Sequence, residues 1–275
     1  MKNENRVLSL LTALLALFFL RCPHSARAEE YTGLMDYQSW AVNVGYPQGL
    51  LIPLGIAGIN QDCFRSRPES AGYTSGRIVI GDSRSCQLGI RQNMTGSDDY
   101  AVFAVWGGHY VPGTGTPILT AERLAEIEQC FHEQIRMRGK CTVFFFATVN
   151  DYEFMNNHNA GFISSAVTSA EEIASMTFEY EGNVYHPEII VIGFDGGRTD
   201  GDIFGIPQET FNRYIDSYNQ ELREAVDASP ILKETAEQFT TVSEITGRGT
   251  TFISDGLHYG DNTLQQIADY MKNIQ

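Results

Sequence analysis

A serine, a histidine and a carboxylate stand in two short motifs that lie far apart in the sequence. Ser83 is the third residue of a G-D-S-R sequence that starts at Gly81, and Asp255 and His258 are the two ends of a D-G-L-H sequence near the C-terminus. A histidine oriented by a carboxylate can take the proton of a serine hydroxyl and so turn a weak nucleophile into an attacking group. The two motifs therefore predict hydrolysis of an ester by a triad of Ser83, His258 and Asp255.

Short apolar runs alternate with helical patterns from Arg77 onward. The expected strands are 77–80, 100–105, 142–147, 188–193 and 250–253. The expected helices are 85–92, 120–138, 208–226 and 262–274. Continuous apolar runs suit strands that are covered on both faces, and alternation of strands with helices is typical of a parallel sheet. We therefore expect an α/β fold, a three-layer α/β/α sandwich around a mostly parallel five-stranded sheet.

This fold would place both motifs at one end of the sheet. Ser83 follows the first strand at the start of a helix, where backbone N–H groups and the helix dipole stabilise developing negative charge. The D-G-L-H motif follows the last expected strand. Taken alone, the first motif is better explained as an ordinary turn in which Asp82 or Ser83 caps the helix. A histidine and a carboxylate expected at the same end of the sheet favour the catalytic interpretation.

Together these motifs resemble those of the SGNH, or GDSL-type, hydrolase superfamily, particularly its bacterial branch whose first motif reads G-D-S-R. The resemblance covers the chain from Gly76 to the C-terminus. It implies that Ser83 is the nucleophile, that the Ser83 N–H forms part of the oxyanion hole, and that Asp255 and His258 are acid and base. It also implies an SGNH-hydrolase-like version of the expected fold and no metal or organic cofactor.

The resemblance implies two further oxyanion-hole residues. The glycine is expected at Gly108, with Gly107 as the alternative, although a plain glycine turn would give the same pattern. The asparagine is expected at Asn150, which stands in T-V-N-D where the family usually has G-x-N-D. Thr148 thus replaces a glycine, and a β-branched residue restricts the backbone of this loop. An Asn-Asp turn without catalytic function is the alternative for this motif.

Charge and scattered histidines exclude several other functions. The net charge is −15, and residues 1–28 carry four basic groups and one acid, so their removal would change −15 to −18. Such a charge opposes nucleic-acid binding, which depends on Lys and Arg. The segment 195–202 is similar to a calcium loop but lacks its terminal glutamate, and the histidines lack metal-ligand spacing. The expected partner is a small-molecule or carbohydrate ester substrate.

The N-terminus has the pattern of a secretory signal peptide. Basic residues precede an apolar run over 7–20, and an A-R-A sequence ends at Ala28. This run is shorter than a bilayer requires, so cleavage is favoured over an uncleaved anchor, and no later segment is expected to cross a membrane. We expect a secreted or cell-envelope protein with a signal peptide (1–28), an N-terminal extension of unknown role (29–75) and one hydrolase-like domain (76–275).

Four cysteines would remain after cleavage, which permits two disulfides outside the cytosol. The favoured pairs are Cys63 with Cys86 and Cys130 with Cys141, and a fully reduced protein is the alternative.

The substrate is expected to be a short-chain ester, including O-acetyl groups on carbohydrate. Aromatic and polar residues flank the motifs and could stack on sugar faces: Trp106, His109, Tyr110, Tyr152 and Tyr259. Core packing is the competing explanation for these rings. A second hypothesis, favoured by Thr148 and by the unassigned N-terminal segment, is a catalytically silent module that keeps the fold and binds a glycan or a protein partner.

Overall fold

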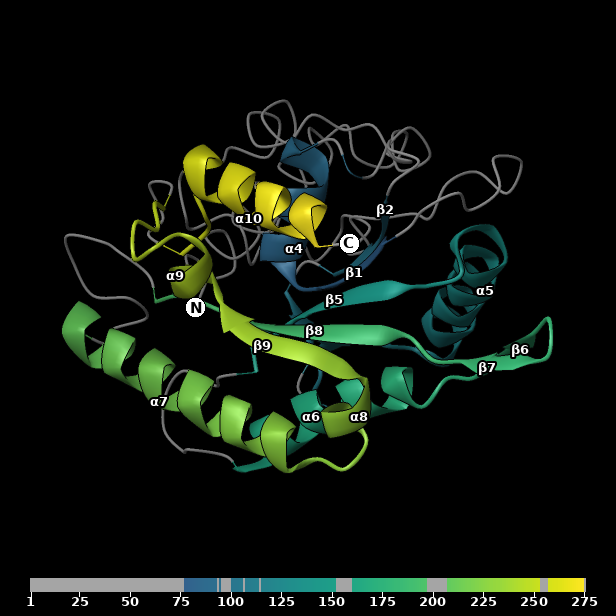
Figure 1. Ribbon diagram of the computed structural model, residues 1–275. Helices are drawn as coiled ribbons and strands as arrows, with labels where there is room; N and C mark the ends of the chain where they lie inside the picture. The colour runs from purple at the N-terminus through teal and green to yellow at the C-terminus, as the bar shows by residue number, and fades with distance from the viewer. Residues whose placement is uncertain are drawn as a thin grey trace, which may run out of the picture.

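The structure of the protein is a computed structural model (Figure 1). The described residues are 77–92, 94, 100–105, 107–113, 115–151, 160–196, 207–252 and 257–274. The predicted signal peptide and N-terminal extension lie outside them, as do Cys63, Trp106, Tyr152 and Asp255. No helix among the described residues has the length and apolar content needed to cross a lipid bilayer.

Five parallel strands form the central sheet in the order β2-β1-β5-β8-β9. Their bounds are β1 Arg77–Gly81, β2 Tyr100–Ala104, β5 Thr142–Phe146, β8 Glu188–Gly193 and β9 Ala236–Thr241. The register pairs Ile78 of β1 with Ala101 of β2 on one side and with Val143 of β5 on the other. The predicted α/β sandwich with a parallel five-stranded sheet is confirmed.

One of the five predicted strands is wrong. The fifth strand is β9, and residues 250–253 contribute only an isolated bridge between Phe252 and Tyr259. The reason is that β9 is an edge strand with the sequence A-E-Q-F-T-T, so it lacks the continuous apolar run that marks a strand covered on both faces. The other four predicted strands agree with β1, β2, β5 and β8 to within one residue at each end.

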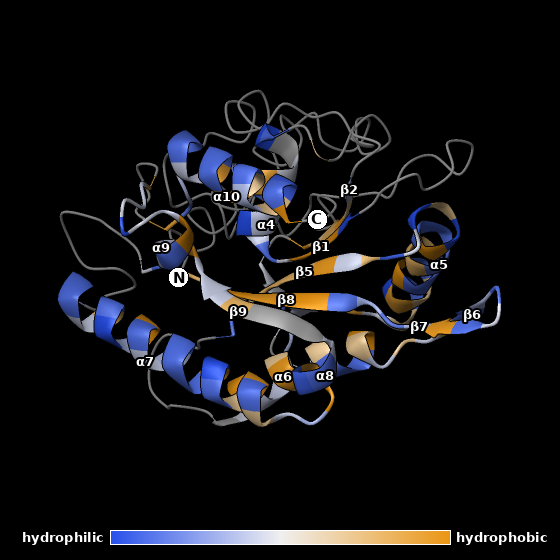
Figure 2. Ribbon diagram, viewed as in Figure 1, coloured by the Kyte–Doolittle hydropathy of each residue, from blue (hydrophilic) through white to orange (hydrophobic). Residues whose placement is uncertain are grey.

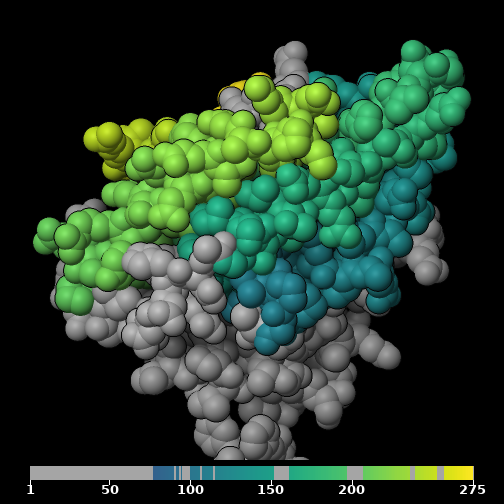
Figure 3. Space-filling model, turned by 90° about the horizontal axis from the view of Figure 1, so that it is seen from below, coloured from purple at the N-terminus to yellow at the C-terminus, as the bar shows by residue number. Residues whose placement is uncertain are grey.

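Helices cover both faces of the sheet (Figure 1). On one face lie α4 (Ser83–Arg91), α9 (Val242–Ile245) and α10 (Asp261–Asn273). On the other lie α5 (Ala121–Arg138), α6 (Ala160–Ala174), α7 (Gln208–Ala228) and α8 (Leu232–Thr235). Their apolar sides turn toward the sheet in Figure 2, and side chains of α6 and α7 form a continuous layer over their face in Figure 3.

The core is divided between the two faces because successive strand residues point in opposite directions. Ile78 and Ile80 of β1 pack in the cluster with α5, α6 and α7, whereas Val79 packs in the cluster with α4 and α10. The smaller elements are a parallel pair, β3 (Gly108–His109) with β4 (Thr116–Pro117), and a hairpin, β6 (Phe178–Tyr180) with β7 (Asn183–Tyr185). The sequence patterns predicted neither these pairs nor α6.

The predicted ends of α5 are confirmed. Thr120 caps the helix by accepting a hydrogen bond from the Arg123 N–H, and Gly139 ends it in the left-handed conformation with φ of 74°.

The predicted disulfides are absent. The thiols of Cys86, Cys130 and Cys141 are buried, and none of these three forms a disulfide, which excludes the pairs Cys63–Cys86 and Cys130–Cys141 in this structure. Burial, followed by the neighbouring Cys130 and Glu188, raises the pKa of the Cys141 thiol well above its ordinary value. The described cysteines therefore serve as small apolar core residues, in agreement with the reduced alternative.

The strand order determines where a ligand site should lie. The chain passes from β1 outward to β2, and then returns to place β5 on the other side of β1. In open parallel sheets the crevice at such a reversal, outside the carboxyl ends of the strands, is where ligands bind. The loops that follow β1 and β5 carry Ser83 and Asn150.

Candidate active site

Ser83 lies at the point where β1 ends and α4 begins. The side chain of Asp82 accepts a hydrogen bond of 2.9 Å from the Arg84 N–H, so it caps the turn that presents Ser83. Gly81 is required here, because a Cβ at this position would lie 2.1 Å from the Ser85 Oγ. The capping interpretation of the motif is therefore correct for Asp82, and it leaves the Ser83 hydroxyl available.

His258 is the nearest described partner of that hydroxyl. Its Nε2 lies 3.0 Å from the Ser83 Oγ, and both residues are buried, with 3% and 5% of their surface exposed. Nε2 can accept the serine proton when the imidazole is neutral and carries its proton on Nδ1. Asp255, the expected partner of Nδ1, lies outside the described residues.

His258 reaches Ser83 by a route different from the predicted one. The loop that carries it follows no strand of the sheet. Instead, the Gly260 N–H donates to the Thr251 carbonyl at 2.8 Å, beside the bridge between Phe252 and Tyr259. From α4, the Gln87 Nε2 donates to the Tyr259 carbonyl at 3.0 Å. This loop is therefore held directly against the helix that carries the serine.

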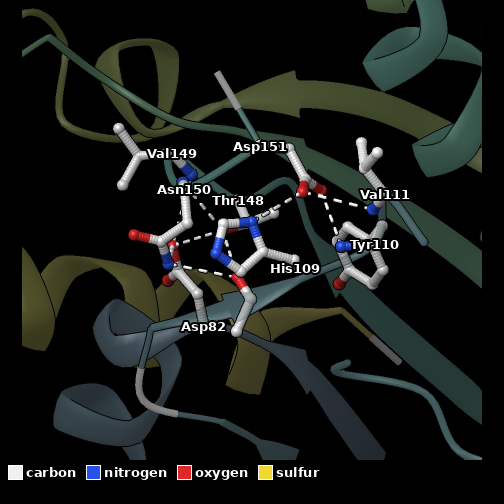
Figure 4. Close-up of polar contacts among 9 residues, drawn as sticks. Asp82, His109, Tyr110, Val111, Thr148, Val149, Asn150 and Asp151 are labelled. Atoms are coloured by element: carbon white, nitrogen blue, oxygen red, sulfur yellow. Dashed lines mark hydrogen bonds and ion pairs between the residues drawn. The ribbon is translucent and has the colours of Figure 1, made fainter. Parts of the chain in front are cut away.

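Asp82 also gathers the loop after β5 (Figure 4). Its Oδ2 accepts hydrogen bonds from the Thr148 hydroxyl at 2.8 Å, the Val149 N–H at 3.2 Å and the Asn150 amide at 3.4 Å. Because Oδ1 already caps the turn before α4, one buried carboxylate ties the nucleophile turn to the asparagine loop. Sequence reasoning considered Asp82 only as a cap and missed this second role.

Thr148, which stands in place of the usual glycine, is hydrogen-bonded within the loop after β5. It is fully buried, and its hydroxyl proton is shared between the Asp82 carboxylate and the Gly108 carbonyl, which lies at 3.0 Å. The same oxygen accepts the Asn150 N–H at 3.0 Å. The hydroxyl thus supports the backbone on which Asn150 stands. The departure from the family pattern is therefore no evidence for a silent site.

The expected oxyanion-hole residues lie together, but not all of their donors are available. The Asn150 Nδ2 donates to the Gly108 carbonyl at 3.1 Å. The Gly108 N–H donates to the Val105 carbonyl at 2.9 Å, within a turn that Gly107 enters with φ of +64°. The Gly107 N–H has no hydrogen-bond partner in the described part of the chain. This geometry favours the alternative, Gly107, over Gly108 as a donor.

A second buried carboxylate, Asp151, organises the neighbouring loop (Figure 4). It accepts hydrogen bonds from the Tyr110 N–H at 2.7 Å and the Val111 N–H at 3.2 Å, and its Oδ1 lies 3.1 Å from the His109 Nδ1. Sequence reasoning missed Asp151. Its place directly after Asn150, at the carboxyl end of a buried strand, was the available signal.

Two of the aromatic residues expected to contact a sugar, Tyr110 and Tyr259, are part of the core. Tyr110 stacks on Phe145 with ring centroids 4.6 Å apart, and its hydroxyl donates to the Phe146 carbonyl at 2.8 Å. Burial, and then the charges of Asp82 and Asp151, raise the pKa of Tyr110 well above its ordinary value. Tyr259 is also buried. For these two residues the sugar-stacking prediction is wrong and core packing is correct.

Comparison with known proteins gives structural likenesses only. No family model matches the sequence, and no curated relative matches it. A solved aryl esterase from M. smegmatis has 10% sequence identity and a TM-score of 0.47, over 73% of this chain and 100% of its own. A carbohydrate acetylesterase from Sinorhizobium meliloti has 11% identity and a TM-score of 0.45, over 73% and 100%. Because both TM-scores lie below 0.5, the function has to be inferred from the site itself.

Proposed function

We propose that the protein is a serine esterase of SGNH type. The observation that carries this proposal is the distance of 3.0 Å between the His258 Nε2 and the Ser83 Oγ, at the start of a helix and at the switch point of a parallel sheet. A nucleophile and a base within hydrogen-bond reach are the minimum for covalent catalysis by a serine. The protected setting keeps bulk water from competing for the same hydrogen bond.

In the proposed mechanism His258 removes the proton of the Ser83 hydroxyl as its oxygen attacks the ester carbonyl. Asp255 is expected to orient the imidazole and to stabilise its charged form. The alcohol leaves with the proton from His258. Water then attacks the acyl-enzyme, and His258 takes a proton from the water and returns it to the Ser83 oxygen. Release of the acid restores the free serine.

The oxyanion is held by three donors in this mechanism. They are the Ser83 N–H at the helix start, one N–H of the Asn150 amide, and a glycine N–H. For Asn150, the long contact of 3.4 Å with Asp82 is the one that the oxyanion would replace. Because the Gly108 N–H already donates to Val105, Gly107 is the better candidate for the glycine donor.

The proposed substrates are short-chain esters, with O-acetyl groups on carbohydrate among them. The sequence shows no long apolar segment beside the motifs with which a lipase would cover an acyl chain. Secretion stays a prediction that depends on residues 1–28. Rates on acetyl, butyryl and octanoyl esters and on an acetylated polysaccharide test the substrate class. A strong preference for the octanoyl ester would reject the deacetylase proposal.

Labelling with a serine-directed phosphonate tests the enzymatic proposal. We expect one phosphonyl group per chain on Ser83, found by intact mass and peptide mapping, and no labelling of Ser83→Ala. Ser85→Ala is the matched control, since Ser85 is a buried serine two positions along the same helix whose hydroxyl has no partner among the described residues. A wild-type protein that stays unlabelled and hydrolyses no ester would favour the silent binding module.

A further inference from the structure

Arg84, the residue after the nucleophile, is a buried cation that the mechanism above does not use. Only 4% of its surface is exposed. Its Nη1 donates to the Tyr259 hydroxyl at 3.2 Å and, more weakly, to the Asp195 carbonyl at 3.4 Å. Its Nε and Nη2 are buried without a hydrogen-bond partner among the described residues.

Such an environment disfavours a charge. Removing a guanidinium from water is costly unless its donors are paired, and an apolar side chain of similar size would avoid the penalty. Two aromatic rings offset part of the penalty, since the guanidinium carbon lies 4.8 Å from the ring centre of Tyr259 and 5.3 Å from that of Phe194. A buried cation with so few hydrogen bonds calls for a functional explanation.

The chain positions of the contacting residues supply that explanation. Arg84 directly follows Ser83, and Tyr259 directly follows His258. One turn further along α4, Gln87 donates to the Tyr259 carbonyl at 3.0 Å. The N-terminal part of α4 therefore holds both the hydroxyl and the backbone of Tyr259, while its first residue contacts His258.

We propose that Arg84, Gln87 and Tyr259 form a clamp that sets the position of the His258 imidazole relative to the Ser83 hydroxyl. The inference rests on the proposed function. Arg84 and Tyr259 are positioning residues, which act through the backbone of the loop and not through contact with the substrate. Burial raises the pKa of Tyr259 to about 12, although the charge of Arg84 opposes the shift. Its phenol therefore remains a neutral acceptor for Arg84 throughout the neutral range.

An anion-binding role for Arg84 is the competing explanation. The two unpartnered nitrogens would suit a carboxylate or phosphate group of a substrate. Both atoms are buried, however, so a ligand that arrives from solution does not meet them in this arrangement. The two explanations differ in the kinetic constant that they affect, because a clamp changes turnover whereas an anion subsite changes substrate binding.

Arg84→Met separates them. A misplaced base costs up to about 100-fold in rate, so we expect kcat on an activated acetate ester to fall by about 10- to 100-fold while KM changes by less than about twofold. The rate of phosphonate labelling of Ser83 should fall by the same factor. Arg84→Lys should recover part of the lost kcat, since lysine keeps a cationic donor for Tyr259. Arg77→Met is the matched control, because Arg77 lies over the ring of Tyr100 at the opposite end of β1.

Tyr259→Phe tests the clamp from its other side and covers the case in which Arg84→Met does not fold. It keeps the ring but removes the hydroxyl, so kcat should fall by a smaller factor than in Arg84→Met. The double variant should be no slower than Arg84→Met, because both changes break one interaction. The clamp would be overturned by losses that multiply in the double variant, or by an unchanged kcat in Arg84→Met. It would also be overturned if Arg84→Met raised KM alone, or if Arg84→Lys were as slow as Arg84→Met.

Phosphonate labelling distinguishes failure of the clamp from failure of the proposed esterase function. If the wild-type protein is labelled on Ser83 and Arg84→Met is labelled equally fast, the esterase stands and only the clamp is wrong. If the wild-type protein is not labelled, the proposed function fails first.

Discussion

Two buried aspartates at the carboxyl end of the sheet both accept hydrogen bonds, but from different parts of the molecule. Asp82 follows β1 and accepts hydrogen bonds from the Arg84 N–H and from three groups in the loop after β5. Asp151 lies in the loop after β5, and among the described residues its hydrogen-bond partners all belong to the neighbouring loop, namely His109, Tyr110 and Val111. Both carboxylates are almost fully buried.

The two aspartates differ in whether their hydrogen-bond partners take part in the proposed reaction. The partners of Asp82 include the amide proposed for the oxyanion hole and the turn that presents Ser83. The partners of Asp151 are backbone groups and a histidine with no part in the proposed reaction. Loss of Asp82 should therefore affect catalysis and stability together, whereas loss of Asp151 should affect stability alone.

Among the residues that contact the two aspartates, the largest effect on turnover is expected for Asn150. Asn150→Ala removes a donor to charge that exists only in the transition state, and such a loss costs about 100- to 1000-fold in turnover. Steady-state kinetics should show this fall in kcat with little change in KM. A fall in substrate affinity with unchanged turnover would make Asn150 a binding residue instead.

Asp82→Asn should be next in size for activity and the largest for stability. The amide replaces one acceptor by a donor that faces the donors of Thr148, Val149 and Asn150. Breaking a buried charged network in this way costs roughly 3–5 kcal/mol in the free energy of unfolding. Displacement of the catalytic groups should lower kcat by about 100-fold. Denaturant unfolding measures the free energy of unfolding, and steady-state kinetics measure kcat. A variant that is as stable and as active as the wild-type protein would contradict the proposed role of Asp82.

Thr148→Val isolates the hydroxyl that links Asp82 to Asn150. Valine keeps the shape of the side chain, so the variant should fold, but kcat should fall by about 10-fold, less than a full displacement of the catalytic groups would cause. Thr148→Ser keeps the hydroxyl and is the matched control. Equal kcat values for the two variants would show that the shape of Thr148 matters and its hydrogen bonds do not.

Asp151→Asn should have the smallest effect on activity. Weakening its contacts with the loop of Tyr110 and Val111 should lower the free energy of unfolding by about 1–3 kcal/mol. Activity below the melting transition should stay within about threefold of wild type, as expected for a loss outside the reacting groups. A loss of turnover as large as that of Asp82→Asn would erase the proposed distinction between the two carboxylates.

The sequence predicted the buried strands of the sheet, and it drew attention to Ser83 and His258, which the structure places within hydrogen-bond distance of each other. Strands such as β5, with its run of aromatic and aliphatic residues, are recognisable because both of their faces need apolar cover. The edge strand β9 and helix α6 lack so clear a pattern, and the spacing of the cysteines did not show that Cys86, Cys130 and Cys141 form no disulfide. Ser83 and His258 were chosen as candidates because their motifs contain the side chains that a serine hydrolase needs.

The supporting residues could not be found in the same way. Whether Asp82 accepts one hydrogen bond or four depends on which loops meet it, and that follows from the strand order. The role of Thr148 likewise depends on the Gly108 carbonyl, which is distant in sequence. A polar residue at the end of a strand is an ordinary turn residue until its partners are placed.

The central claim is that His258 activates Ser83, and the rate of phosphonate labelling tests it most directly. Removal of the base from such a pair costs several orders of magnitude, so His258→Ala should label Ser83 at least about 1000-fold more slowly than the wild-type protein, with unchanged folding by circular dichroism. Labelling of His258→Ala on Ser83 at the wild-type rate would contradict the claim.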